Sequence, residues 1–291
     1  MSDTSFEINN QDESIKTHLT ITGVVITAIL VLLALTVILP LLMPWLFVFK
    51  TRLECSYNPW SLPTQIRWIN FIEAWVAVRI DQGLINTVIV CLGTVACTIP
   101  SAAMAGYIFA RYRSKVTEVV FYCILAGYFV PMQMILIPLY KLCSQMNLID
   151  TLPGLFFPLT AFGIPFWTII YRAFFYGLPG ELAEAARIDG AGHTATFFKV
   201  MLPLAKPATV LATMLVFISA WSDYLMSLIL INKLSLFTMQ LRIAQFMNSY
   251  GVDNMPRYAA AAIIAAAPTV LLYILGHRWI LKGTLAGALK G

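Results

Sequence analysis

Long stretches without a single charged side chain dominate this sequence and limit what it can fold into. Residues 19–49, 84–110, 119–140 and 151–171 contain no Asp, Glu, Lys or Arg. A helix that crosses the hydrocarbon core of a bilayer needs roughly 20 mostly apolar residues. The runs are continuously apolar and lack the alternation of apolar and polar residues that is typical of barrel strands. The sequence therefore predicts an all-α integral membrane protein.

Two further runs bring the expected number of spans to six. Asp223 interrupts residues 208–232 once, and residues 259–276 end at His277–Arg278. Only 11% of the chain is charged, whereas soluble domains contain roughly 25%. We expect an acidic N-terminal tail at residues 1–18, followed by one membrane domain at residues 19–291. Its predicted spans are about 19–49, 84–110, 116–142, 151–176, 207–232 and 259–281.

The distribution of basic residues predicts the orientation of the chain. The short connection after the second span carries Arg111, Arg113 and Lys115. Because Lys and Arg are enriched in cytoplasmic loops, this connection is placed inside the cell, and both termini follow it there. The formal net charge of +5 forms no basic stripe with interleaved aromatic residues, so no nucleic-acid partner is expected.

Several chemistries leave no signature in the sequence. The five cysteines include no C-x-x-C pair, so no metal site is expected. No G-x-x-x-x-G-K-[ST] stretch occurs, so the chain is not expected to bind ATP or another cofactor itself. The three histidines, His18, His193 and His277, are scattered along the chain. We therefore expect a protein that is not an enzyme.

The connection between the fourth and fifth spans, residues 177–205, has the most unusual sequence. Pro179-Gly180 ends the fourth helix, residues 181–188 favour a short helix, and Pro203 ends a second one. Gly190 in the intervening turn can adopt a positive φ without steric cost. Both short helices are amphipathic, which leaves three interpretations open: they lie on the lipid surface, pack on the protein's own helix ends, or dock with a cytoplasmic partner.

This connection resembles the EAA signature of prokaryotic ABC importer permeases. The matching positions are Glu184, Ala185, Ala186, Gly190, Val200, Leu202 and Pro203. Further similarity lies at residues 105–113, 137–140, 221–225 and 282–291. Over residues 20–291 the chain resembles the six-span permease subunit of carbohydrate-uptake ABC importers, of the maltose-transporter G type.

The resemblance implies a role for both cytoplasmic segments. The hairpin of residues 177–205 would be a coupling helix that sits in a cleft of a separate ATPase subunit, and that subunit would bind ATP and Mg²⁺. The tail at residues 282–291, with Gly287, Lys290 and Gly291, would reach toward the ATPase dimer. A frayed basic end is the alternative interpretation of this tail.

The translocation path is predicted from polar and aromatic residues inside the spans. An intramembrane carboxylate such as Asp223 is costly and faces a protein interior or an aqueous cavity, so it either lines the path or anchors a neighbouring helix. Trp221, Tyr224 and Gln133 are further candidates for the lining. Tyr128 and Trp167 are candidates for stacking on a sugar ring, although aromatic residues in spans more often face lipid or the core.

The resemblance also implies the partners and the location. These are a homologous second permease subunit, two ATPase subunits and an extracytoplasmic solute-binding protein, assembled in the inner (plasma) membrane of a prokaryote. The expected substrate is a carbohydrate, an oligosaccharide in particular. The alternative function is that of a stand-alone secondary transporter or channel for a polar solute, which predicts inverted repeats and buried ionisable relays.

Overall fold

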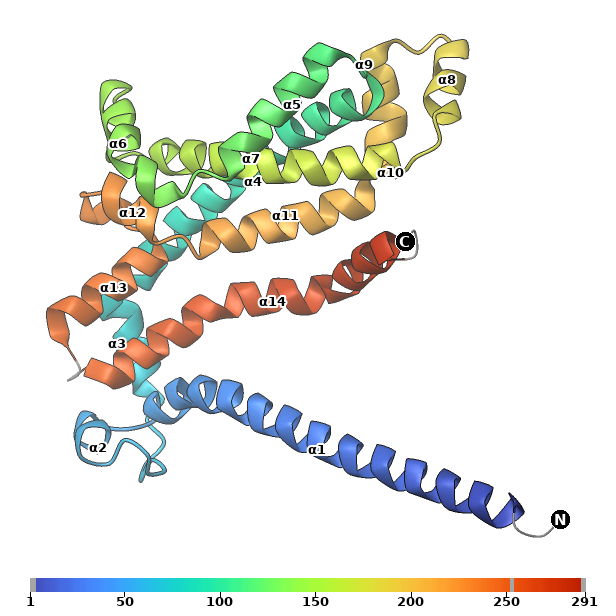
Figure 1. The fold of residues 1–291 in the computed structure, drawn as a ribbon. Helices are drawn as coiled ribbons and strands as arrows, with labels where there is room; N and C mark the ends of the chain where they lie inside the picture. The colour runs from blue at the N-terminus through green and yellow to red at the C-terminus, as the bar shows by residue number, and fades with distance from the viewer. Residues whose placement is uncertain (1–3, 252–253, 289–291) are drawn as a thin grey trace.

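The computed structural model describes residues 4–251 and 254–288, and in this part of the chain all regular secondary structure is helical. The long helices fan out from one end of the molecule (Figure 1). They are α1 (Thr4–Phe47), α4 (Ile80–Arg111), α7 (Pro153–Tyr176) and α14 (Met255–Ala288). Four segments in them are long and apolar enough to cross a membrane: Gly23–Phe47, Ile80–Arg111, Pro153–Tyr176 and Met255–Gly276.

Two further candidate spans are bent pairs of helices. The predicted third span divides into α5 (Lys115–Tyr128), the 3-10 turn η1 (Met132–Ile135) and α6 (Leu136–Gln145), and its two halves differ in direction by 91°. Pro131 lies at the break, and its backbone is not helical there, with φ −60° and ψ 130°. Proline lacks the N–H group that would donate the next hydrogen bond of a helix. The described residues thus hold four candidate spans, or up to six if each bent pair is one span.

The fifth predicted span is not one helix. α11 (Lys206–Trp221) ends at Trp221, and α12 (Leu225–Leu230) begins after a turn. The helical segment that precedes α11, His193–Leu204, meets it at 77°. A helix of the length of α11 spans about 24 Å, which is less than the hydrocarbon core of about 30 Å. The prediction of a continuous helix over 207–232 was wrong, because the sequence pattern shows apolarity and not where a chain turns.

The terminal helices extend beyond their predicted limits. α1 is helical from Thr4, so residues 4–18 continue the first helix. α14 begins at Met255 instead of residue 259 and continues through residues 282–288, which were assigned to a tail. Of the predicted tail residues, Gly287 lies in the last turn of α14, whereas Lys290 and Gly291 lie outside the described residues.

The core forms where α4, α7 and α11 meet. Gly106 of α4 permits the closest approach, because a Cβ there would lie 2.5 Å from the Tyr171 Cβ and 2.8 Å from the Arg172 nitrogen of α7. Small residues bring membrane helices together in this way. Ala102, Ala103 and Tyr171 are buried in the same interface. This interface fixes the position of everything attached to the ends of α4 and α7.

Short helices form the end of the molecule opposite the hairpin, which we call the α3 end. They are α2 (Arg52–Tyr57), α3 (Ile69–Val78), η3 (Leu234–Leu236) and α13 (Met239–Tyr250). α6 and α12 lie at the same end (Figure 1). The described ends of α1 and α14 point the other way, toward the side on which the hairpin lies (Figure 1).

Candidate functional site

The hairpin after α7 is the first candidate site. It contains α8 (Glu181–Ile188), α9 (His193–Thr196), the π-helical turn η2 (Phe197–Met201) and α10 (Leu202–Leu204). The predicted helix at residues 181–188 is therefore present with the same limits. Gly190, in the turn between the arms, has a φ of +83°, a conformation that side chains other than glycine adopt at a cost.

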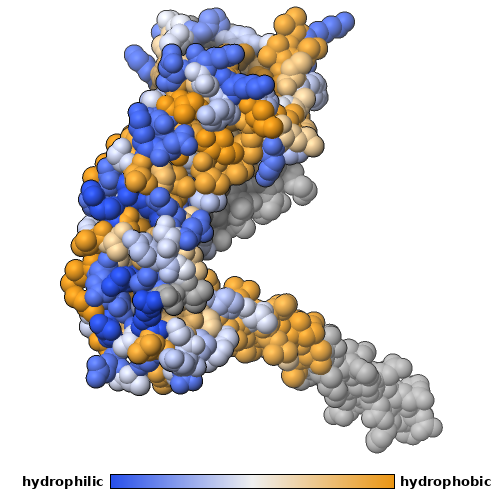
Figure 2. All heavy atoms as spheres, turned by 90° about the vertical axis from the view of Figure 1, so that its left-hand side faces the viewer, coloured by the Kyte–Doolittle hydropathy of each residue, from blue (hydrophilic) through white to orange (hydrophobic). Residues whose placement is uncertain are grey.

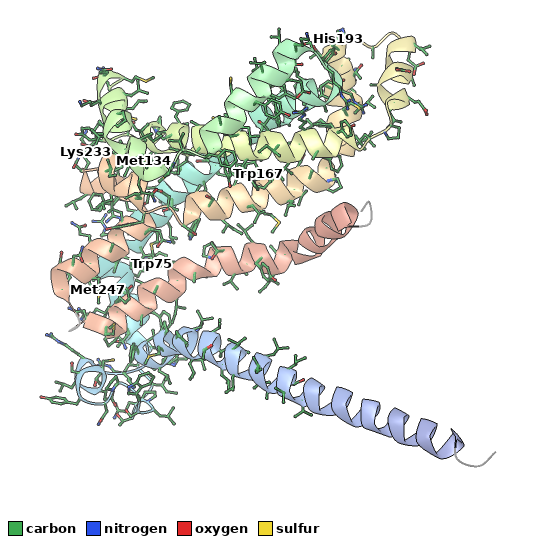
Figure 3. The ribbon with its side chains drawn as sticks, in the orientation of Figure 1. Trp75, Met134, Trp167, His193, Lys233 and Met247 are labelled. Atoms are coloured by element: carbon green, nitrogen blue, oxygen red, sulfur yellow. The ribbon has the colours of Figure 1, made fainter. Side chains whose placement is uncertain are left out.

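The hairpin is fixed to the end of α4. Arg111 Nη2 donates hydrogen bonds to the carbonyl oxygens of Leu178 (3.1 Å) and Pro179 (3.3 Å). The Tyr112 hydroxyl and His193 Nδ1 are hydrogen-bonded at 2.5 Å. His193 lies at the extreme of the hairpin, far along the molecule from Lys233 and Met134 at the α3 end (Figure 3). Any rigid-body movement of α4 would therefore carry the hairpin with it.

One side of the hairpin packs into the chain's own core. Ala183, Phe197 and Met201 are buried in the cluster that also contains Tyr107 and Phe175. Among the predicted coupling residues, Ala186 is buried, while Val200 and Leu202 are partly buried against the same cluster. Packing on the protein's own helix ends, one of the three interpretations, thus accounts for this side of the hairpin.

The opposite side of α8 faces outward. Residues three and four positions apart share one face of a helix, and Glu181, Glu184, Ala185 and Ile188 are all exposed. Ile188 is 86% exposed, and it is a large apolar side chain at the tip of the arm. Gly190 and Pro203 are exposed as well. The structure therefore divides the seven predicted coupling residues into an outward group and an inward group.

A cavity midway along the helices is the second candidate site. It has a volume of about 400 Å³ and lies between α4, α5, α7 and α11. Tyr128 and Phe166 are stacked on its wall, with ring centroids 5.7 Å apart and an interplanar angle of 27°. Trp167, at the centre of α7 in Figure 3, completes the aromatic side. Thr94, Ser219 and Asp223 supply oxygen atoms to the lining.

Asp223 borders this cavity from the turn between α11 and α12 and not from a continuous helix. Its Oδ1 accepts a hydrogen bond from the Met226 backbone nitrogen at 3.3 Å. Its Oδ2 accepts one from the Ser227 nitrogen and one from the Ser227 hydroxyl, each at 3.1 Å. Asp223 therefore lies between two helices and not inside a continuous one, because α11 ends before it. Its carboxylate caps α12 and reaches the cavity at the same time.

The other path candidates do not line this cavity. Trp221 is 2% exposed, donates from Nε1 to the Ala265 carbonyl at 2.9 Å and stacks on Phe217. It therefore joins α11 to α14. Gln133 is exposed in η1, and Tyr224 is 38% exposed in the turn beside Asp223. Their role in transport stays a prediction.

Sequence analysis did not single out several residues of the cavity. Thr94, Phe166 and Ser219 each lie in an apolar helix whose sequence does not reveal which face points inward. The bend at Pro131 was the one available signal, because Met132 directly after it also lines the cavity. No group of three or more His, Cys, Asp or Glu side chains that could hold a metal ion occurs among the described residues.

Together, these features define a class. The chain is a multi-helix membrane protein with a polar–aromatic cavity between its helices, and a helical hairpin that is hydrogen-bonded to α4 projects from one end of it. Residues 102–284 match the family described as "binding-protein-dependent transport system inner membrane component", and the chain belongs to this family. It is therefore a permease subunit of an ABC transport system in the inner membrane. A stand-alone secondary transporter or channel, the alternative function, is not favoured.

Relatives match nearly the whole chain. The diacetylchitobiose uptake system permease protein NgcG of Streptomyces coelicolor is 30% identical over 265 residues, which is 90% of this chain and 87% of the relative. The melibiose/raffinose/stachyose import permease protein MelC of Bacillus subtilis is 29% identical over 267 residues, covering 90% and 96% of the two chains. A bacterial ABC transporter involved in alginate import has the same fold, with a TM-score of 0.78 at 20% identity over 89% of this chain and 96% of the other.

Proposed function

We propose that this chain forms half of the membrane pathway of an ATP-driven carbohydrate importer and that the hairpin transmits movement between the pathway and a separate ATPase. The observation that carries the proposal is the hairpin itself. It is bound to the end of α4 by Arg111 and His193, and it presents an outward face that includes Glu184, Ala185 and Ile188. A compact knob of this kind suits the transfer of rigid-body motion better than a flexible loop does.

The outward face has the chemistry of a docking element. Ala185 allows a close approach, Ile188 offers apolar area at the tip, and Glu181 and Glu184 add negative charge beside them. Burial of an exposed apolar side chain of this size contributes about 1.5–3 kcal/mol. The carboxylates would then pair with basic residues of an ATPase cleft, which gives the contact its orientation.

The test uses the complete complex with its ATPase and binding protein. Ala185→Arg and Glu184→Lys each change the outward face without touching the buried side. We expect uptake and its coupling to ATP hydrolysis to fall by more than about tenfold, while the amount of inserted chain stays constant. Lys141→Gln, an exposed charge on α6 at the other end, is the control. Unchanged uptake with both hairpin variants would disprove the coupling role.

The carbohydrate assignment rests on the cavity together with the relatives. The stacked Tyr128–Phe166 pair and Trp167 form an apolar wall, and Thr94, Ser219 and Asp223 face it with hydroxyl and carboxylate groups. Sugar rings present an apolar face and a rim of hydroxyls, so they fit such a lining. The two relatives are named for the uptake of diacetylchitobiose and for the import of melibiose, raffinose and stachyose, which supports a carbohydrate substrate here.

Tyr128 provides the direct test of this assignment. Tyr128→Ala removes an exposed ring from the cavity wall and should raise the half-saturation concentration for uptake about fivefold, since an aromatic contact contributes about 0.5–1.5 kcal/mol. Tyr122→Ala, an exposed tyrosine of the same helix α5 outside the cavity, should change uptake less than twofold. Equal effects of the two variants on a panel of oligosaccharides would argue against a path through the cavity.

The proposed assembly contains a second permease subunit, two ATPase subunits and an extracytoplasmic binding protein. We place the hairpin and both termini in the cytoplasm, in agreement with Arg111, Arg113 and Lys115 near the hairpin. The six spans are then α1, α4, the bent α5–α6 pair, α7, α11 with α12, and α14. The exposed apolar surface of α1 supports a lipid or second-permease partner for that helix.

A further inference from the structure

A polar pocket at the α3 end is used neither by the proposed path nor by the hairpin. It has a volume of about 530 Å³ and lies between the α3–α4 junction, η3 and α13. Among the described residues its walls carry two guanidinium groups and no carboxylate, and the polar side chains are those of Arg79, Gln82, Ser235, Arg242 and Gln245. Guanidinium groups bind carboxylate and phosphate oxygens through paired, charge-assisted hydrogen bonds. The pocket therefore favours an oxyanion.

Arg242 is the most buried charge of this pocket, and its donors are only partly used. It is 8% exposed, and its Nη2 donates to the Gln82 Oε1 and to the Leu234 carbonyl, each at 2.7 Å. Its Nε is buried without a hydrogen-bond partner. Within residues 4–251 and 254–288 no carboxylate forms a salt bridge with Arg242. A buried charge without a counterion is costly, so an anion in the pocket would stabilise it.

The α3–α4 junction brings a second positive charge to the pocket. Arg79 joins the two helices in the left-handed conformation, with a φ of +56°, and pairs with the exposed Asp81 at 3.7 Å. Gly83, one turn into α4, leaves room for Arg242, because a Cβ there would lie 2.8 Å from the Arg242 Cδ. Desolvation and the neighbouring Arg79 lower the pKa of Arg242, and Asp81 offsets this shift in part. A bound anion would relieve the repulsion between the two arginines.

An exposed apolar stripe of α3 leads to this pocket. Residues three and four positions apart share one face of a helix, and Ile69, Ile72 and Val76 are all exposed on such a face, with Arg79 three residues further on. The opposite face of α3 is buried in the protein. A helix with an apolar face and a basic end is typical of segments that lie in a membrane interface. Figure 2 looks onto the α3 end and shows hydrophilic and hydrophobic residues side by side on it.

The length of α4 brings the pocket to the level of the lipid headgroups. α4 has 32 residues and is thus about 48 Å long, and a bilayer with its headgroups is about 40–45 Å thick. Because Arg111 ends α4 near one surface, Arg79, directly before the first residue of α4, comes to the other surface. Trp68 and Trp75 are exposed nearby, and tryptophan is enriched at this depth of a membrane.

We propose that the pocket binds the phosphate group of an anionic phospholipid whose acyl chains lie along the apolar stripe of α3. Arg79 and Arg242 donate to the phosphate oxygens, while Ile72 and Val76 contact the chains. An oxyanion that carries apolar chains matches both features at once, whereas a free phosphate would use the pocket alone. Only the choice of the outer leaflet rests on the proposed function, which places the hairpin in the cytoplasm.

The experiment measures lipid binding by the complete transporter. The purified complex is titrated in neutral detergent with phosphatidylglycerol, and bound lipid is counted by native mass spectrometry. Arg242→Gln removes the buried charge and should weaken the affinity about tenfold, and Arg79→Asn should weaken it about fivefold. Asparagine tolerates the positive φ of position 79, so this exposed site gives a result even if Arg242→Gln fails to fold. Equal affinities of the wild type and Arg79→Asn would overturn the proposal.

Lys233→Asn is the matched control, because Lys233 is exposed directly before η3 and does not line the pocket. It should change the affinity less than twofold, and an effect as large as that of Arg79→Asn would show a general attraction of charge instead of a site. Ile72→Ser and inorganic phosphate separate the lipid from a free ion. Ile72→Ser should weaken lipid binding about threefold, since it removes apolar contact with the chains. Displacement of the lipid by an equal concentration of phosphate, with no effect of Ile72→Ser, would overturn the lipid as the ligand.

A protein subunit on the same face is the competing outcome. Val76→Cys, labelled with a photoactivatable cross-linker in nanodiscs that contain phosphatidylglycerol, should react with lipid. A cross-link to another chain of the complex would show that a subunit covers α3, and it would overturn the proposal.

This proposal and the proposed function fail separately. Lipid binding is measured without ATP and without transport, so its absence would leave the expected uptake defects of Glu184→Lys and Ala185→Arg in place. Unchanged uptake in those two hairpin variants would disprove the coupling role, and the difference in lipid affinity between Arg79→Asn and Lys233→Asn would still stand.

Discussion

α1 and α4 are both apolar enough to cross a membrane, yet they have different environments. The spanning segment of α4 is 39% buried inside the chain, whereas that of α1 is not buried at all. α4 carries small residues at positions that face α7, including Ala102, Ala103 and Gly106. α1 carries large side chains around its whole circumference, such as Leu32 and Val37, which are 63% and 64% exposed. Hydropathy predicts insertion, but only side-chain size and spacing decide whether a helix packs within its own chain.

α1 is attached to the rest of the molecule through its C-terminal end. Val48 and Lys50 are fully buried there, and Asn70 Nδ2 donates to the carbonyl oxygens of both, at 2.6 and 3.0 Å. The Lys50 ammonium donates to the Asn58 and Pro59 carbonyls at 2.9 and 2.7 Å. The helix is thus anchored at one end and leaves its apolar surface for lipid or another subunit.

The largest expected difference between the two helices comes from truncating one leucine in each environment. Leu155 of α7 is fully buried against the α4 residue Val90, and Leu155→Ala should lower the free energy of unfolding by about 2–5 kcal/mol. Leu32→Ala on α1 should change it by less than about 0.5 kcal/mol. Thermal unfolding of the purified chain in detergent measures both. Similar losses would show that α1 packs on its own chain after all.

A glycine exchange tests the close approach of α4 to α7. In Gly106→Ala the new methyl group must displace backbone atoms of α7, and we expect a loss of about 2 kcal/mol. Gly127 of α5 has no atom within 4 Å of the corresponding position. Gly127→Ala should therefore be neutral or slightly stabilising, because alanine favours the helix. The same detergent assay distinguishes the two variants, and a tolerated Gly106→Ala would contradict the tight interface.

The anchor of α1 should have a smaller effect. Asn70→Ala leaves the Val48 and Lys50 carbonyls without this donor, at a cost of about 1–2 kcal/mol. Hydrogen exchange should increase at residues 48–58 and remain unchanged in α4. Gln65→Ala, on the exposed part of the same connection, is the control. Equal exchange in both variants would place the anchor elsewhere.

The smallest effect is expected from pH. The Glu54 carboxylate accepts hydrogen bonds from the Thr51 backbone nitrogen at 2.6 Å, from the Thr64 hydroxyl and from the Thr64 backbone nitrogen at 3.0 Å. These bonds lower the pKa of Glu54 to about 2. A depressed carboxyl pKa stabilises the folded connection above the ordinary value of 4.5. This stabilisation is lost as the pH falls from that value toward 2. Proteolysis of residues 51–64 should therefore increase at acidic pH in the wild type, and Glu54→Gln should abolish the pH dependence.

Sequence reasoning succeeded where the signal is local. The apolar runs predicted α4 and α7 within a few residues, and the capping and turn residues predicted α8 and the positive φ of Gly190. It failed where the outcome depends on a neighbour. Nothing in residues 208–232 shows that the chain turns at Ser222, or that Asp223 caps α12 beside a cavity that Tyr128 and Phe166 close from other helices.

The amino-acid sequence by itself determined that this chain enters a membrane, roughly where its helices lie, and that a helical hairpin follows α7. These properties depend on hydrophobic length and on backbone preferences, which short segments carry independently of one another. Tertiary structure alone decided which face of the hairpin points outward, which side chains surround the cavity, and that Asp223 caps α12 beside that cavity. Those outcomes depend on the relative rotation and separation of helices, which are set by packing between residues far apart in the chain.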